Sequence, residues 1–121
     1  MKNILELSDN ERYEYLITTS VKQKEIWLLQ AEDGMIAMLE DGNAQEYIPV
    51  WPSKEFAQNQ INEDWADYEP DSMKIYEFME WMKELAEDKI MIAAFPNNNN
   101  KIIPLEPLVI KQHLQEELER R

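Results

Sequence analysis

The sequence contains no cysteine, two glycines and a single histidine among its 121 residues. The lack of cysteine excludes disulfides, thiolate nucleophiles and thiolate metal sites, and it is typical of a reducing compartment. With His113 as the sole imidazole and no G-x-S-x-G motif, the residues of a zinc site or a serine triad are missing. Gly34 and Gly42 each follow an aspartate in a turn-like stretch, which leaves no glycine-rich loop for a phosphate. We therefore predict no catalytic residues, no metal site and no cofactor.

Basic residues are also scarce. Asp and Glu number 25 against 12 for Lys and Arg, which gives a net charge of -13. A nucleic-acid-binding protein needs a basic face, and an anionic membrane surface repels a protein of this charge. No apolar run approaches the ~20 residues of a spanning helix, and residues 1–6 turn polar too early for a signal peptide. We expect a cytoplasmic protein that binds neither nucleic acid nor membranes.

The length and composition are those of one globular domain, expected over residues 1–121. Hydrophobic residues make up 44% of the chain and charged residues 31%. Ser8 and Glu11 match the capping-box pattern, and apolar positions at helical spacing predict a helix from about Asp9 to Lys22. In that helix Tyr15 is expected on the polar side.

Short apolar runs separated by turn residues predict strands in the next part of the chain. These runs lie at residues 26–29, 35–39 and 47–51. We interpret them as a β-meander in which Gly34 and Gly42 adopt positive φ in the two turns. Because Pro49 cannot donate a ladder hydrogen bond, the third strand is expected at a sheet edge or with a bulge.

The second half of the chain predicts further helices and strands. Ser53 is expected to cap a short helix to about Ile61, and an extended segment at residues 65–68 is expected to end at Pro70. The remaining elements are a helix capped by Ser72 and ending near Glu87, strands at residues 90–95 and 101–105, and a final helix opened by Pro107. This order predicts a single α+β domain with a mainly antiparallel sheet of about 4–6 strands and helices packed on it.

Acidic residues concentrate between Ser53 and Asp88, where eleven acids face three lysines. Such a segment indicates either a surface that attracts a basic partner or a solvated helical face. Asp67, Glu69 and Asp71 alternate like the first ligands of an EF-hand loop, but the glycine and the final glutamate of that loop are missing.

Four tryptophans raise the question of core or site. Trp27 lies in an apolar run and is expected in the core, whereas Trp51, Trp65 and Trp81 are flanked by prolines or acids. Each of these three either fills a gap between sheet and helix or anchors an interface. We expect Trp51 and Trp65 to clamp the short helix that follows Ser53. The candidate binding residues are Trp51, Trp65, Asp67, Tyr68, Glu69 and Trp81.

The aromatic and proline-bounded segments resemble a family of small bacterial proteins, the domain of unknown function 2750. The resemblance rests on Trp27, Asp33-Gly34, Asp41-Gly42, Ile48-Pro49-Val50-Trp51-Pro52, Ala57, Trp65-Ala66-Asp67-Tyr68-Glu69-Pro70, Phe78 and Trp81. It implies a compact α+β bacterial domain and brings no catalytic residues. The chain departs from the expected pattern at Asp88-Lys89, where a turn glycine is expected, and in the asparagine loop at residues 97–100.

The leading hypothesis is a non-enzymatic, acidic interaction domain, of the immunity type or an adaptor, that covers a basic protein partner. Its surface is expected around Asp67 to Glu69 with Trp81. The alternative is a small enzyme or ligand-binding protein in which Asp67, Glu69, Trp51 and Trp65 line a cleft. A domain with no dedicated site is a third interpretation, and the sequence defines no oligomeric state.

Overall fold

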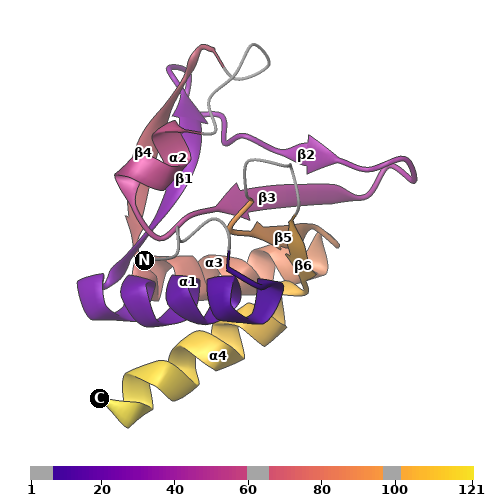
Figure 1. Cartoon of the computed structure of the whole chain (residues 1–121). Helices are drawn as coiled ribbons and strands as arrows, with labels where there is room; N and C mark the ends of the chain where they lie inside the picture. Colours follow the sequence, from indigo (N-terminus) through magenta and orange to yellow (C-terminus); the bar gives the residue numbers. More distant parts are fainter. Residues whose placement is uncertain (1–6, 60–65, 97–101) are drawn as a thin grey trace.

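The computed structural model describes residues 7–59, 66–96 and 102–121, and within these ranges it forms four helices and six strands (Figure 1). Along the chain the elements are α1 (Asp9–Gln23), β1 (Glu25–Ala31), β2 (Leu39–Glu40), β3 (Glu46–Val50), α2 (Lys54–Gln58), β4 (Tyr68–Lys74), α3 (Ile75–Glu87), β5 (Met91–Ala94), β6 (Ile103–Leu105) and α4 (Pro107–Arg120). The predicted α+β class is confirmed.

The strands form two sheets. β1 and β4 pair antiparallel, and the second sheet has the order β2-β3-β5-β6, in which β3 and β5 are the parallel pair. The two sheets meet where Trp27 and Trp51 exchange two backbone hydrogen bonds, each 2.9 Å from nitrogen to oxygen. These two tryptophans, one in β1 and one directly after β3, therefore join the sheets through their main chains.

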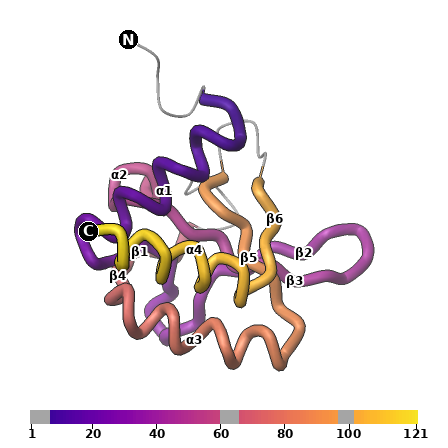
Figure 2. Tube along the Cα trace, turned by 90° about the horizontal axis from the view of Figure 1, so that it is seen from below, coloured from indigo at the N-terminus to yellow at the C-terminus, as the bar shows by residue number. Residues whose placement is uncertain are grey.

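The helices α1, α3 and α4 form a layer along one side of the strands. In Figure 2, α4 lies between α1 and α3, and it contacts both of them. The short helix α2 instead packs beside β1 and β4. All four helices and three of the strands contribute to one buried core, which includes Leu16, Val21, Ile26, Leu28, Ile48, Val50, Ala57, Phe78, Met82, Ile92, Ile110 and Leu114.

Helix α1 begins as the sequence predicts. The Ser8 hydroxyl accepts from the Glu11 amide at 3.2 Å and the Glu11 carboxylate accepts from the Ser8 amide at 3.3 Å, which completes the capping box. The placement of Tyr15 on the polar side is wrong, because its ring is half-buried against Phe56 and Phe95. Rings from α2 and the end of β5 reach this side of α1, which helical periodicity alone does not reveal.

A buried arginine ties α1 to the end of β5. Arg12 is 1% exposed, its Nε donates to the Phe95 carbonyl at 2.9 Å, and its Nη1 pairs with Asp9 at 3.3 Å. A buried charge is tolerated only when such partners are present. The contact links residues 83 positions apart and helps to hold α1 against the sheet.

The predicted meander is only partly present. Residues 35–37 return along β1, where the Ala31 amide donates to the Met35 carbonyl and the Ala37 amide to the Leu29 carbonyl. In this stretch only Ile36 forms a β-bridge, and the strand that follows, β2, is two residues long. Gly34 has the predicted positive φ, 92°. The same prediction for Gly42 is wrong, because in that turn it is Ala44 that adopts positive φ, 65°.

The expectation that Pro49 marks an edge strand or a bulge is also wrong. β3 lies inside the four-stranded sheet and pairs with β5 in an unbroken register that includes Pro49 and Ala93. The Val50 carbonyl accepts from the Phe95 amide, so strand alternation turns the Pro49 nitrogen toward the opposite side. On that side β2 pairs only with Glu46 and Tyr47, and no ladder hydrogen bond is lost at the proline.

The boundary between β4 and α3 differs from the prediction as well. The extended segment does not end at Pro70 but continues as β4 to Lys74, and Ser72 lies within the strand rather than capping the helix. β4 pairs with β1 over its whole length, so a long-range contact extends it beyond its local turn signals. α3 then starts at Ile75, whose amide donates to the Lys24 carbonyl at 3.0 Å.

The last elements agree with the sequence. β5 is central between β3 and β6, β6 pairs antiparallel with β5, and α4 starts with Pro107 in its first turn. Trp27, expected in the core, packs against it but is only half-buried. The helix that follows Ser53 ends at Gln58, before the predicted end near Ile61, and the Ser53 side chain makes no capping hydrogen bond. The asparagine loop lies outside the described residues.

Candidate functional site

A surface hollow of about 600 Å³, called the acidic hollow below, lies at one end of the β1–β4 pair. It is lined by Gln30, Ala31, Glu32, Asp67, Glu69, Pro70 and Asp71. The strand register brings these segments together, because Gln30 pairs with Glu69 and Leu29 with Pro70. Residues far apart in the sequence thus form one surface.

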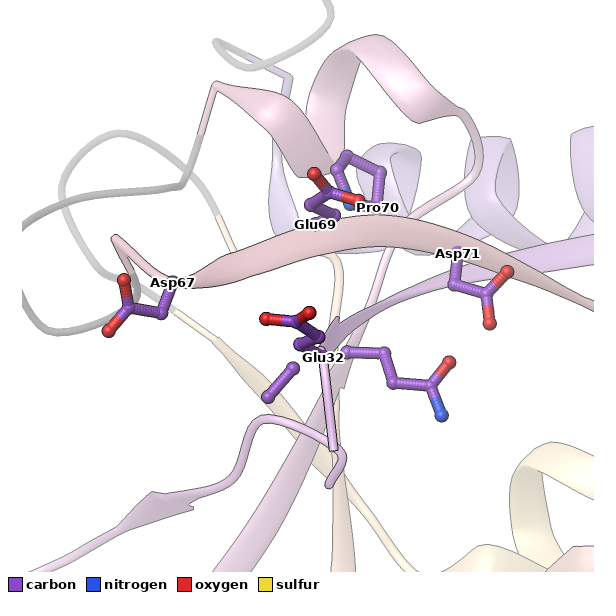
Figure 3. Close-up of a pocket in the computed structure, with 7 residues that line it drawn as sticks. Glu32, Asp67, Glu69, Pro70 and Asp71 are labelled. Carbon is purple, nitrogen blue, oxygen red and sulfur yellow. The ribbon is translucent and has the colours of Figure 1, made fainter. Parts of the chain in front are cut away.

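Among the described residues that line the acidic hollow, four are acidic and none is basic. All four carboxylates are exposed, and Figure 3 shows Glu32 between Asp67 and Asp71, with Glu69 on the far side of the β4 ribbon. The side-chain amide of Gln30 is uncharged and donates to the Gly34 carbonyl at 3.0 Å, so it adds no positive charge to the hollow. The result is a concentrated negative potential that favours cationic groups.

The carboxylates of the acidic hollow point in different directions rather than toward one centre (Figure 3). Within residues 7–59, 66–96 and 102–121, no group of three or more His, Asp or Glu side chains is arranged to hold a metal ion. The sequence pattern that suggested alternating calcium ligands therefore does not produce a described metal centre. The arrangement is suited to charge recognition by several separate carboxylates.

The predicted site residues fall into separate places. Asp67 and Glu69 line the acidic hollow, whereas the neighbouring Tyr68 is half-buried and packs against the core. Trp51 is 0% exposed, so it is a core residue and not a surface anchor. Trp65 lies outside the described residues.

Trp81 belongs to a second hollow on α3. It lies with Tyr76, Glu77, Glu80 and Glu84 around a shallow depression of about 500 Å³. These five residues, the α3 stripe, share no member with the acidic hollow. The expected single surface around Asp67 to Glu69 with Trp81 is therefore divided between two places.

The acidic hollow also contains residues that the sequence did not indicate. Glu32 was not a candidate because it follows β1, far along the chain from Asp67. Only the β1–β4 pairing brings it to the same place. The sequence does predict two extended segments here, but the pattern of a single sequence does not specify which strands pair with each other.

A third hollow, of about 290 Å³, lies between α1 and α4. There the Tyr13 hydroxyl and His113 Nδ1 are hydrogen-bonded at 2.6 Å, and the two rings meet edge to face. Burial raises the pKa of Tyr13 well above its usual value. His113 is half-buried, and its contact with Tyr13 joins the two helices.

Outside these hollows, Asp41 holds a surface turn. Its carboxylate accepts from the amides of Asn43 at 2.8 Å and Gln45 at 3.0 Å and from the Tyr47 hydroxyl at 3.0 Å. These hydrogen bonds stabilise the ionised carboxylate and so lower the pKa of Asp41, with the largest effect from the Asn43 amide. The cluster is a structural clasp for the turn before β3.

The described residues form a small acidic α+β domain with two hollows lined by exposed carboxylates, one beside β4 and one on α3. A family model described as protein of unknown function (DUF2750) matches residues 13–114. The chain therefore belongs to this family, as the sequence resemblance indicated. The comparisons found no matching curated protein and no matching solved structure. In the described part of the chain, no helix has both the length and the apolar character needed to span a membrane.

Proposed function

We propose that the protein is a non-enzymatic, acidic interaction domain of the bacterial cytoplasm that binds a basic segment of a partner protein in the acidic hollow. The observation that carries this proposal is the set of four exposed carboxylates that line one hollow, with no Lys or Arg among its described lining residues. The net charge of -13 extends the same preference over the whole chain.

Physical chemistry supports a cationic protein segment as the occupant. Four like charges near one another repel, and a bound Lys or Arg side chain relieves that repulsion. Ala31 and Pro70 add apolar surface to the hollow, along which the methylene stems of long cationic side chains can lie. Because the carboxylates are exposed, the interaction is expected to weaken steeply with salt.

The alternative function, a small enzyme or ligand-binding protein with a cleft of carboxylates and tryptophans, is less well supported. It requires Trp51 beside Asp67 and Glu69, whereas Trp51 is fully buried and its main chain is paired with Trp27. An immunity-type protein and an adaptor would use the same acidic surface, and the identity of the partner distinguishes them. A basic toxin as the captured partner would assign the protein to the immunity type.

The proposal is tested by capturing partners from the native cell by chemical cross-linking. The hollow-neutral variant carries Glu32→Gln, Asp67→Asn, Glu69→Gln and Asp71→Asn. A charge-matched control carries Glu40→Gln, Glu55→Gln, Glu87→Gln and Glu119→Gln, all at exposed positions outside the hollow. Both variants lose four negative charges, so they differ only in where the charge is removed.

The wild type and the charge-matched control are expected to capture the same basic protein, and the hollow-neutral variant is expected to lose it. Capture of that protein by all three forms, or of an acidic partner by the wild type, contradicts the proposal. Circular dichroism of the three proteins provides the folding control.

A further inference from the structure

One face of α3 is not covered by the rest of the described chain. Tyr76 is 58% exposed, Trp81 is half-buried, and the three glutamates of the α3 stripe are exposed. The opposite face of the same helix buries Ile75, Phe78 and Met82. Figure 2 shows α3 at the rim of the helix layer, with α4 on its inner side.

The indole of Trp81 is held in place by the core. Its ring meets that of Phe78 edge to face, with ring centres 6.3 Å apart and an interplanar angle of 75°. Phe78 is 0% exposed, so it gives Trp81 a rigid support. A ring already fixed in this way loses little conformational freedom when a partner binds.

Carboxylates surround this ring along the helix. Glu77 lies one turn before Trp81 and Glu84 about one turn after it, at the spacings that place side chains on one helix face. The neighbouring cation, Lys83, pairs with Glu80 at 3.2 Å. The α3 stripe thus combines aromatic faces, which attract cations, with carboxylates on both sides of the indole.

We infer that the α3 stripe is a second interaction surface, which binds an arginine-bearing segment of a partner protein by stacking a guanidinium on Trp81 between Glu77 and Glu84. Arginine fits better than lysine because its planar group stacks on an aromatic ring and pairs with carboxylates in two-point geometry. A second copy of this chain is a poor occupant, because each copy carries a net charge of -13.

This inference goes beyond the proposed function and does not depend on it. The acidic hollow takes its β4 residues from Glu69 to Asp71, whereas the α3 stripe begins at Tyr76, after the end of β4, and the two share no lining residue. Changes at one surface are therefore expected to leave the other unaltered.

The experiment is an NMR titration of the ¹⁵N-labelled hollow-neutral variant, so that binding in the acidic hollow does not contribute. The probe is a synthetic peptide with arginines every four residues in an alanine background, which matches the one-turn repeat of the stripe. The control peptide has citrulline, an uncharged analogue, at the arginine positions. Trp81→Phe, made in the same background, identifies the indole N–H resonance of Trp81.

The Trp81 indole resonance and the backbone amides of α3 are expected to shift saturably with the arginine peptide. The citrulline peptide should bind at least about tenfold more weakly, and Trp81→Leu should weaken the arginine peptide at least about threefold. The double variant Glu77→Gln, Glu84→Gln is also expected to weaken binding of the arginine peptide, and it replaces Trp81→Leu if that change perturbs folding.

Three results overturn the inference. One is the absence of a saturable shift at millimolar peptide, and another is a shift spread evenly over all acidic surfaces. The third is movement of the Trp81 resonance with protein concentration alone, which would assign the stripe to a second copy of the chain.

Discussion

The indoles of Trp51 and Trp81 have different surroundings. Trp51 is 0% exposed, and its main chain closes the junction between the two sheets with Trp27. Trp81 meets Phe78 edge to face and lines a shallow hollow together with three glutamates. A fully buried ring contributes mainly to stability, whereas a half-buried ring on an acidic helix face is available for contact.

Replacement of these two tryptophans by alanine should therefore have different effects on unfolding. Trp51→Ala is expected to lower the free energy of unfolding by about 3–5 kcal/mol, because it removes a large buried side chain and leaves a cavity. Trp81→Ala should cost about 1 kcal/mol. Denaturant titrations of both variants measure the difference, and equal losses in the two would contradict the assignment of core and surface.

The sequence predicted the position of Trp81 from its local pattern, whereas Trp51 was expected both to clamp a helix and to be a candidate binding residue, and its full burial does not support the second expectation. Trp81 falls at the edge of a helical apolar stripe, and periodicity alone predicts that position. The expectation that Trp51 is mainly structural is confirmed by its burial. Glu32 was missed because its neighbours in the acidic hollow come from β4, and that pairing is not a local property.

At the scale of elements, local signals and long-range pairing contributed differently. The capping box of α1 and the first-turn Pro107 of α4 were predictable because both depend on adjacent residues. The extension of β4 through Pro70 to Lys74 was not, because pairing with β1 outweighs the turn signals in that segment. In the same way, Pro49 could enter an interior strand only because β2 ends before it.

The end of α3 supplies a prediction on stability. Lys89 has a φ of 60°, a conformation that favours glycine, and its amide donates to the Ala86 carbonyl at 3.2 Å. Lys89→Gly is expected to raise the free energy of unfolding by about 1 kcal/mol, because it removes the steric cost of the left-handed backbone. Lys89→Ala is the control, since it removes the side-chain charge and keeps that cost. If both variants changed stability equally, backbone strain would not be the cause.

The Asp41 clasp predicts a local dependence on pH. Its pKa is lowered by hydrogen bonds in the folded state, so its contribution to the turn is present above the unfolded value of about 3.9 and is lost as the pH falls below it. The amide resonances of Asn43 and Gln45 should therefore titrate together with a midpoint below that value. Asp41→Asn, which keeps an acceptor oxygen, should abolish this titration. A midpoint above 4 in the wild type would be inconsistent with the clasp.

At the scale of the whole molecule, charge is distributed unevenly along the β1–β4 pair. The acidic hollow lies at one end, while Lys22, Lys24 and Lys74 lie near the other, where Glu25 pairs with Lys74. The α3 stripe is a second acidic surface, separate from the first. A basic partner is therefore expected to approach the hollow end of the pair and to avoid the lysine end.

The sequence predicted the acidic segment between Ser53 and Asp88 but not its division into two surfaces. The turn of the chain from β4 into α3 separates Asp67 and Glu69 from Trp81. Composition can indicate that a protein prefers cationic partners, whereas the location of the contact depends on three-dimensional pairing. This is why the class of fold and the sign of the charge were accessible and the geometry of the site was not.

The most direct test of the central claim is an isothermal titration of a lysine- and arginine-rich peptide into the wild type, the hollow-neutral variant and the charge-matched control at physiological salt. If the acidic hollow is the binding site, the hollow-neutral variant should lose about tenfold or more in affinity, while the control should stay within about threefold of the wild type. Equal weakening in the two variants would contradict the account, because it would show that only the total charge of the protein matters.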